Sequence, residues 1–179
     1  YQLYNRVFGL VNDHAGYSLT SEGQEDFTII QYNVEDQYTP HCDGTCDGSE
    51  HNKYGRVATA VIYCKAADRG GGTTFTNNDI FVTPKKGMAT FFSYKDMNTG
   101  MMDDGDTEHS GCPVLAGEKW ITTVWMREGV SNSEPWNKYD PSGLAIMESE
   151  QIPLDLEIKT DGATTSDELE DDAISDYTF

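Results

Sequence analysis

Two histidines and one aspartate have the types and spacing of a metal site. His41 and Asp43 form a His-x-Asp triplet, and a distant second histidine follows at His109. Side chains two residues apart on an extended segment point the same way, so His41 and Asp43 can hold one ion together. Two imidazoles and one carboxylate bind one face of Fe(II) and leave the opposite face open for substrate and oxygen. We therefore expect His41, Asp43 and His109 to bind Fe(II).

The alternative interpretation of the triplet is a solvated loop with a stray histidine, because short polar triplets occur by chance. Its surroundings favour a site. Residues 27–32 are β-branched and aromatic, which predicts a strand just before the triplet. Lys119 follows the second histidine and begins an apolar stretch that ends at Trp125. A lysine is a compact charge on a flexible stem, so Lys119 suits the far carboxylate of a dicarboxylate co-substrate.

The pattern of apolar residues predicts one helix and many short strands. Apolar residues recur at helical spacing between Tyr4 and Val11, which predicts an amphipathic helix over residues 2–14. Turn-rich segments separate the strands. Many short strands, glycine-rich turns and little helix favour a mainly β fold, a double-stranded β-helix (jelly roll) with the N-terminal helix as support. Strands are expected at about residues 27–33, 57–64, 73–76, 80–83, 88–94 and 120–126.

The length and the charge distribution suggest one domain and an extension. A chain of 179 residues with 37% hydrophobic residues can bury one good core. We assign residues 1–147 to the jelly-roll domain and residues 148–179 to an acidic C-terminal extension. The extension has eleven acidic residues against one lysine, a net charge of −10 out of −19 for the chain. It is expected to be solvated, although the alternating apolar residues from Ile152 to Ile158 would also suit a short docked strand.

The composition also argues against two classes of partner. A net charge of −19 without a basic stripe repels phosphate backbones, so nucleic acid is a poor candidate partner. No stretch approaches the ~18 consecutive apolar residues of a membrane-spanning helix, and no signal-peptide pattern opens the chain. The first residue, Tyr1, is not an initiator methionine, so we expect a processed or truncated start.

Several blocks together resemble the catalytic domain of prolyl 4-hydroxylases of the collagen and plant or algal type. These enzymes are Fe(II)- and 2-oxoglutarate-dependent dioxygenases. The resemblance covers about residues 27–127 and implies the jelly-roll fold. The family usually has a helix and a strand upstream, which implies a domain that is incomplete at its N-terminus. The matching blocks, in the order of the family, are residues 31–43, 56–63, 71–75, 84–92 and 109–125.

The resemblance implies a reaction and a set of catalytic residues. Oxygen and 2-oxoglutarate would be consumed, succinate and CO2 released, and a peptidyl proline hydroxylated. Ascorbate is expected to help by rescuing oxidised iron. By resemblance the catalytic residues are the three candidate ligands and Lys119. The substrate is then a peptide or protein that contains proline.

The resemblance also assigns the walls of the site. Tyr32, Thr74 and Trp125 match positions of the co-substrate pocket, where Tyr32 offers a phenol to the far carboxylate. Each of the three would also suit ordinary packing. Tyr38 and Arg56 match positions that contact the substrate peptide. Arg127 stands where related enzymes often carry a histidine used in substrate contact, so we include Arg127 among the substrate residues.

The four cysteines leave the redox compartment open. A disulfide between Cys42 and Cys46 would tighten the loop after Asp43, and two free thiols fit this spacing equally well. Cys42 as an iron ligand is disfavoured, because its side chain on an extended segment points away from those of its neighbours. The resemblance favours the endoplasmic reticulum or secretory pathway, and the cytoplasm remains open.

Two other functions stay open at this point. A dioxygenase of the same fold could act on another residue or on a small molecule. A non-catalytic binding module on the same scaffold is the second alternative, which the complete set of candidate iron ligands and Lys119 disfavours.

Overall fold

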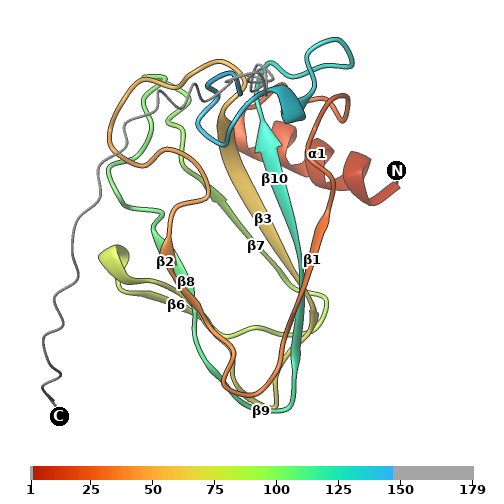
Figure 1. Cartoon of the computed structure of the whole chain (residues 1–179), viewed down its shortest axis with the longest axis vertical. Coiled ribbons are helices and arrows are strands. Elements are labelled where there is room, and N and C mark those ends of the chain that lie inside the picture. The colour runs from red at the N-terminus through yellow and green to blue at the C-terminus, as the bar shows by residue number, and fades with distance from the viewer. Residues whose placement is uncertain (1, 147–179) are drawn as a thin grey trace, which may run out of the picture. The chain divides into compact units, whose positions relative to one another are not determined.

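Two four-stranded antiparallel sheets face each other in the computed structural model, which describes residues 2–146 (Figure 1). The larger sheet has the order β1 (Thr28–Tyr32), β10 (Lys119–Arg127), β3 (Arg56–Lys65) and β7 (Ala89–Ser93). The smaller sheet has the order β2 (Tyr38–His41), β8 (His109–Gly111), β5 (Thr73–Phe75) and β6 (Ile80–Val82). Strands β4 (Arg69–Gly70) and β9 (Val114–Ala116) pair to form a separate two-stranded sheet. Two 3-10 helices span Thr76–Asn78 and Trp136–Lys138.

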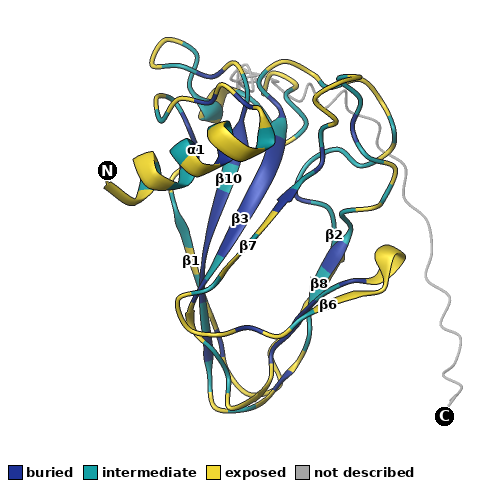
Figure 2. Ribbon diagram, turned by 180° about the vertical axis from the view of Figure 1, so that it is seen from behind, coloured by how far each residue is buried: buried dark blue, intermediate teal, exposed yellow. Residues whose placement is uncertain are grey.

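Helix α1 (Gln2–Ala15) covers the outer face of the larger sheet (Figure 2). Its buried side chains, Phe8 and Val11, belong to one hydrophobic cluster with residues of β3 and β10. The opposite side of the helix is exposed, as the helical spacing of its apolar residues predicts. The predicted supporting helix is therefore confirmed, and it extends one residue beyond the predicted end.

The central strands β3 and β10 are buried on both faces. Alternate side chains of a strand point to opposite faces, so Ala58 and Ala60 pack in the cluster under α1, whereas Val61 and Tyr63 pack between the sheets. Both strands are accordingly almost continuous runs of buried residues. The second cluster also contains Phe75 of the smaller sheet, so it joins the two sheets. The site described below lies in this space between the sheets.

The jelly-roll prediction is confirmed, and the structure adds short strands that the sequence did not indicate. All six predicted strands are present, within a few residues of the predicted bounds. The strands that were not predicted are short: β2, β4, β8 and β9 have two to four residues each. Such segments carry too little periodicity to be recognised, yet β2 and β8 carry two of the candidate ligands.

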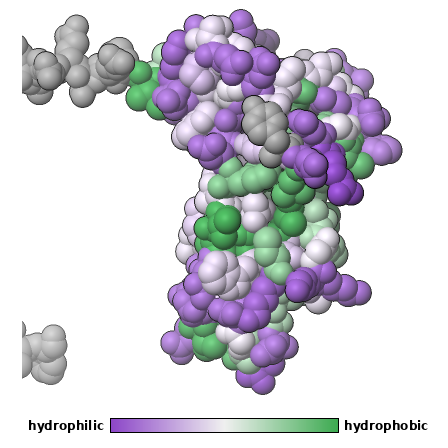
Figure 3. Space-filling view, turned by 90° about the vertical axis from the view of Figure 1, so that its right-hand side faces the viewer, coloured by the Kyte–Doolittle hydropathy of each residue, from purple (hydrophilic) through white to green (hydrophobic). Residues whose placement is uncertain are grey.

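Strand β1 forms one edge of the larger sheet, and the apolar side chain of Ile29 on this strand is 66% exposed. The face seen in Figure 3 shows apolar surface across its middle, between hydrophilic surfaces above and below.

Among residues 2–146, the helices are too short and too polar to cross a membrane. The predicted acidic extension and its alternative short strand lie outside the described residues.

Candidate active site

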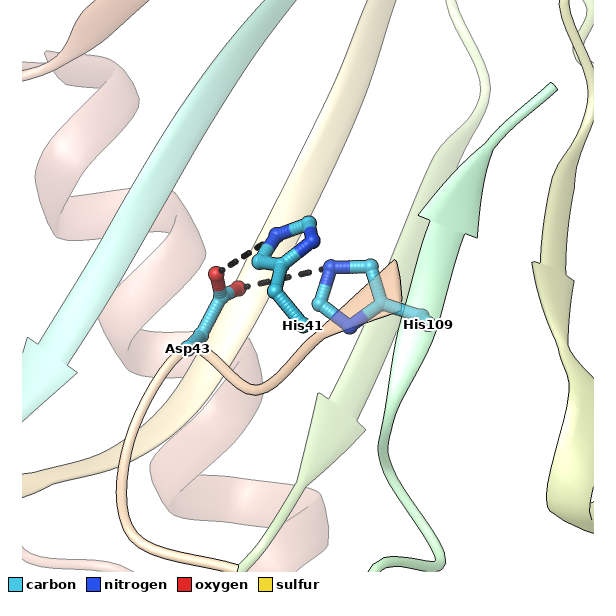
Figure 4. Close-up of side chains that lie close together, drawn as sticks. All are labelled: His41, Asp43 and His109. Carbon is cyan, nitrogen blue, oxygen red and sulfur yellow. Dashed lines mark ion pairs between the residues drawn. The ribbon is translucent and has the colours of Figure 1, made fainter. Parts of the chain in front are cut away.

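His41 and His109 lie opposite each other on neighbouring strands. Strands β2 and β8 pair in a register that sets His41 directly across from His109, with ring centres 4.4 Å apart. Asp43 follows β2, and its carboxylate oxygens lie 3.5 Å from His41 Nε2 and 3.8 Å from His109 Nε2 (Figure 4). One ligand atom from each residue lies within 4.8 Å of the other two. These three donors can therefore hold a single divalent ion.

Backbone carbonyls set the orientation of both imidazoles. His41 Nδ1 lies 2.8 Å from the carbonyl oxygen of Thr39, and His109 Nδ1 lies 3.0 Å from that of Thr107. In each case the carbonyl can only accept, so Nδ1 carries the proton and Nε2 keeps its lone pair. Each Nε2 lone pair is thus free to bind a metal on the side of Asp43, an arrangement that is typical of histidine ligands.

The carboxylate of Asp43 is anchored to the larger sheet. Thr59 of β3 donates a hydrogen bond of 2.7 Å to Asp43 Oδ2, and the hydroxyl of Tyr94 lies 3.3 Å from Thr59 Oγ1. Burial alone would raise the pKa of Asp43, but the hydrogen bonds and the nearby histidines outweigh it and lower that pKa. Asp43 is therefore ionised, as a metal ligand must be.

The two histidines differ in their surroundings. Burial opposes the charging of His41, but the adjacent Asp43 carboxylate and the Thr39 carbonyl outweigh it, so the pKa of His41 is raised. Burial dominates at His109, whose pKa is lowered despite the charge of Asp43. His109 also packs against two aromatic rings, Phe75 and Phe92, at 5.5 and 4.7 Å between centres. His109 is therefore neutral, and the Thr107 carbonyl and the two aromatic rings fix its orientation.

A disulfide closes the loop that carries Asp43. The Cys42 and Cys46 sulfurs lie 2.00 Å apart, and the two Cα atoms lie 6.3 Å apart. The structure thus selects the disulfide from the two states that the spacing allowed. It also removes Cys42 as a metal ligand, because a disulfide sulfur is no thiolate.

Lys119 is a buried cation in the same pocket as the three candidate ligands. It is 2% exposed, and its Nζ donates 3.0 Å to the carbonyl oxygen of Gly71 and lies 4.7 Å from the ring centre of Tyr32. Burial lowers its pKa. Within residues 2–146 no carboxylate pairs with it. A buried ammonium without a counter-ion is costly, so this pocket fits an anionic ligand.

A glycine allows the backbone to reach this lysine. Gly71 has a φ of 68°, and a Cβ at this position would lie 3.3 Å from Lys119 Cδ. The positive φ favours glycine, and the missing side chain leaves room for the stem of the lysine. The Gly-rich segment before β5 therefore shapes the pocket.

Two of the three predicted pocket residues lie in this pocket. Tyr32 of β1 is the direct ladder partner of Lys119, and burial raises the pKa of its phenol, so it stays protonated and can donate. Trp125 of β10 lines the pocket, and its Nε1 is buried without a hydrogen-bond partner among the described residues. Both residues therefore have polar atoms to offer to a ligand.

The prediction for Thr74 is wrong, and its neighbour Thr73 takes the place. Alternation along β5 turns Thr73 and Phe75 inward, where both are buried, and turns Thr74 to the other face. Thr73 lines the pocket, whereas Thr74 donates a hydrogen bond to the Ile80 carbonyl of the next strand. The Gly-Gly-x-Thr block therefore starts at Gly70, which makes Thr73 its threonine, and not at Gly71, which would make it Thr74. Phe75 could have indicated this, because an apolar residue that faces inward turns Thr73, two positions earlier, inward as well.

The structure does not place Arg127, a predicted substrate residue, at the surface or in the pocket. Arg127 is 1% exposed and forms an ion pair with Glu25, with its Nε 2.6 Å from Oε1. Its Nη1 donates to the carbonyl oxygens of Tyr54 and Asp140, at 3.0 and 2.6 Å. With its Nε and Nη1 already bonded and only 1% of the residue exposed, Arg127 does not reach a peptide at the surface. No residue near Arg127 in the sequence indicates its partner Glu25, which lies 102 residues away along the chain.

The two remaining substrate candidates differ. Tyr38 is 49% exposed, lines the pocket and touches the edge of the His41 ring, with 4.0 Å between centres. It stands where a peptide can reach it. The side chain of Arg56 is only 13% exposed and is bound to Glu25 and to the Asp43 backbone. Contact of Arg56 with a peptide stays a prediction. The sequence did not indicate Thr59, Thr73 or Glu25 as residues of the site.

The comparisons with known proteins agree with this geometry. A family model described as "2OG-Fe(II) oxygenase superfamily" matches residues 27–127. The prolyl 4-hydroxylase subunit alpha-1 of Caenorhabditis elegans is 34% identical over 159 residues, which cover 84% of this chain and 27% of that protein. The human subunit alpha-1 is 31% identical over 131 residues, which cover 69% of this chain and 23% of the relative. The chain thus spans about a quarter of the length of these curated relatives.

A solved structure shares the fold. The 2OG complex of the viral collagen prolyl hydroxylase from Paramecium Bursaria Chlorella virus-1 superposes with a TM-score of 0.61 and 29% sequence identity. The superposition covers 70% of each chain.

Proposed function

The chain belongs to the 2OG-Fe(II) oxygenase superfamily, and from this we propose that it hydroxylates proline residues in peptides or proteins, with Fe(II), 2-oxoglutarate and O2. The observation that carries the proposal is the buried Lys119, which has no counter-ion among residues 2–146 and shares one pocket with the His41, Asp43 and His109 donors. The prolyl 4-hydroxylase relatives support the choice of proline. Ascorbate is proposed as the reductant that maintains the iron.

The donor set fits Fe(II), since it offers two imidazoles and one ionised carboxylate from a single side. When bound, Fe(II) with 2-oxoglutarate supplies the activation of O2 for hydroxylation of a C–H bond, with release of succinate and CO2. The protein supplies position and electrostatics. His41, Asp43 and His109 would hold the metal, and the Thr59 hydroxyl fixes the carboxylate that faces it.

Lys119 would pair with the carboxylate of 2-oxoglutarate that lies away from the metal. Charge-assisted hydrogen bonds are about twice as strong as neutral ones, and the phenol of Tyr32 and the hydroxyl of Thr73 stand in the same pocket to add more. The apolar lining, which includes Ile121 and Trp125, excludes water and strengthens these interactions. The co-substrate is thus selected by its two charged ends.

Thr73 and Thr74 provide a matched pair of variants. We expect Thr73→Val to raise the KM for 2-oxoglutarate by roughly 5- to 10-fold, the loss of one hydrogen bond of about 1 kcal/mol. Thr74→Val should leave the KM unchanged, because its side chain points to the other face of β5. Succinate release at varied 2-oxoglutarate measures both. An equal effect of the two substitutions would contradict the assignment of Thr73 to the pocket.

Tyr38 would contact the peptide at the open end of the pocket. We expect Tyr38→Ala to raise the peptide KM by about 10-fold or more, because a prolyl ring loses the aromatic surface beside His41. Decarboxylation of 2-oxoglutarate in the absence of peptide should continue, since Tyr38 acts on the peptide and not on the co-substrate. Tyr38→Phe keeps the ring and is the control. Loss of uncoupled decarboxylation in Tyr38→Ala would place the residue in the co-substrate site instead.

One screen tests the proposed function directly. Succinate release is measured with proline-rich peptides, with peptides that lack proline, and with free amino acids, and mass spectrometry locates the added oxygen. The proposal requires an oxygen on a peptidyl proline. Oxygen on another residue or a free amino acid would indicate a sibling enzyme of the same fold. A protein that binds no Fe(II) would indicate a binding module.

A further inference from the structure

Glu25 has a buried carboxylate that lies between two arginines. Its Oε1 accepts hydrogen bonds of 2.6 Å from Arg56 Nε and of 2.6 Å from Arg127 Nε. Its Oε2 accepts a further bond of 2.7 Å from Arg56 Nη2. Arg56 is therefore gripped at two nitrogens, and its guanidinium plane is fixed by Glu25.

The same guanidinium of Arg56 reaches two parts of the candidate active site. Its Nη1 donates 2.9 Å to the backbone carbonyl oxygen of Asp43, one of the three candidate ligands. Its Cζ lies 4.0 Å from the ring centre of Trp125, which lines the pocket. Arg56 thus touches both the backbone of a ligand and the wall of the pocket, and Glu25 sets the angle at which it does so.

Arg127 holds Glu25 from the other side. Its guanidinium also bonds to the carbonyls of Tyr54 and Asp140, and its backbone exchanges two hydrogen bonds with the side chain of Gln24, at 2.7 and 2.8 Å. The segment that carries Glu25 is therefore tied to the end of β10. Buried ion pairs of this kind give little net stability over apolar residues, so the geometry they impose is their best-supported use.

We infer that Glu25 and Arg127 are positioning residues, which act through Arg56 to fix the Asp43 backbone and the Trp125 ring. The inference deepens the proposed function and rests on it for the metal. Under this inference Arg127 holds Glu25 in place, although its own side chain does not reach a substrate. Neither Glu25 nor Arg127 lines the pocket, so any effect of these residues on the metal must pass through an intermediate.

Charge-conserving substitutions separate position from electrostatics. Glu25→Asp keeps the negative charge but shortens the arm, so it cannot bridge both arginines. Arg127→Lys keeps the positive charge but loses the planar fork that reaches Glu25 and two carbonyls together. If only charge mattered, both variants would bind a metal as the unchanged protein does. Positioning instead predicts weaker binding in both.

The first measurement is the Kd for Mn(II) of the metal-free protein, without peptide or turnover. We expect an increase of about 10-fold or more in both variants, the loss that is usual when a hydrogen-bonding partner of a metal ligand, here Arg56, is displaced. The second is acrylamide quenching of Trp125 fluorescence in a Trp120→Phe/Trp136→Phe background. We expect stronger quenching in both variants, because Arg56 no longer covers the ring at a fixed angle.

Glu134→Asp is the control, since Glu134 pairs with Lys138 at the surface, and it should change neither measurement. Near-UV circular dichroism shows whether each variant has folded. If Glu25→Asp does not fold, the Mn(II) affinity and the quenching of Arg127→Lys decide whether the inference holds, since this variant keeps an ion pair to Glu25. Unchanged Mn(II) affinity and quenching would overturn the inference, and so would the failure of both variants to fold. A protein that binds Mn(II) as expected but hydroxylates no peptide would overturn only the proposed function.

Discussion

We expect His109→Ala to abolish hydroxylation while the domain remains folded. The substitution removes one of two imidazoles from a three-donor set, and no other donor among residues 2–146 stands close enough to replace it. The loss of packing against Phe75 and Phe92 should cost on the order of 1–3 kcal/mol. A domain of this size has roughly 5–15 kcal/mol of stability, so most molecules stay native.

His51→Ala is the matched control. His51 is also largely buried and lies 3.6 Å from a Glu128 oxygen, but it does not belong to the donor set. Its loss should therefore lower stability to a similar degree and leave Fe(II) binding intact. Iron content, thermal unfolding and product formation are measured for both variants. Residual turnover above a few per cent in His109→Ala would contradict the three-ligand assignment.

The other two ligands should behave in the same way. His41→Ala and Asp43→Ala should each remove turnover without unfolding the domain. Asp43→Glu is the milder change, since its longer arm displaces the carboxylate and should weaken iron binding without removing a donor. Turnover retained in Asp43→Ala would contradict the assignment of this carboxylate to the metal.

Lys119→Ala should show the second large effect, on the co-substrate. Without the ammonium, the far carboxylate of 2-oxoglutarate would be buried without a partner, at a cost on the order of 3–5 kcal/mol. The KM for 2-oxoglutarate should thus rise by roughly two orders of magnitude or more. Lys119→Arg should retain part of the binding, because the charge persists in a bulkier planar group. Mn(II) affinity should barely change in either variant.

A second variant at this position tests the same idea from the opposite side. Lys119→Met should raise the free energy of unfolding of the ligand-free protein, because it replaces a buried ammonium, unpaired within the described part of the chain, by an apolar side chain of similar length. Lys65→Met, at an exposed lysine paired with Glu118, is the control and should change the stability little. If Lys119→Met both binds 2-oxoglutarate normally and loses stability, then Lys119 is a structural residue.

Local patterns were sufficient for the scaffold and for the pairing of two of the three candidate metal donors. The helical spacing in α1 and the apolar runs of β3 and β10 are signals within one element, and their burial follows from it. The i, i+2 spacing of His41 and Asp43 likewise predicts that they point the same way, and their 3.5 Å separation confirms it. Each of these signals lies within a stretch of about fifteen residues or fewer.

The failures depend on contacts between distant segments or on a register of one residue. Thr73 and Thr74 are chemically identical neighbours, so only the pleat of β5 tells which one faces the pocket. Arg127 meets Glu25 across 102 residues of sequence, and nothing near either residue indicates the other. The spacing of Cys42 and Cys46 fits both a disulfide and two thiols, and their placement in the fold decides between them.

The disulfide beside Asp43 has a practical consequence for the choice of assay buffer. Ascorbate reduces iron but leaves disulfides closed, whereas a thiol such as dithiothreitol opens them by exchange. Opening the small ring between Cys42 and Cys46 lowers the stability of the fold by ~2 kcal/mol, because the unfolded chain gains entropy, and it frees the segment that carries a candidate metal ligand. The two reductants are therefore not interchangeable for this protein, and activities measured in one cannot be compared directly with activities measured in the other.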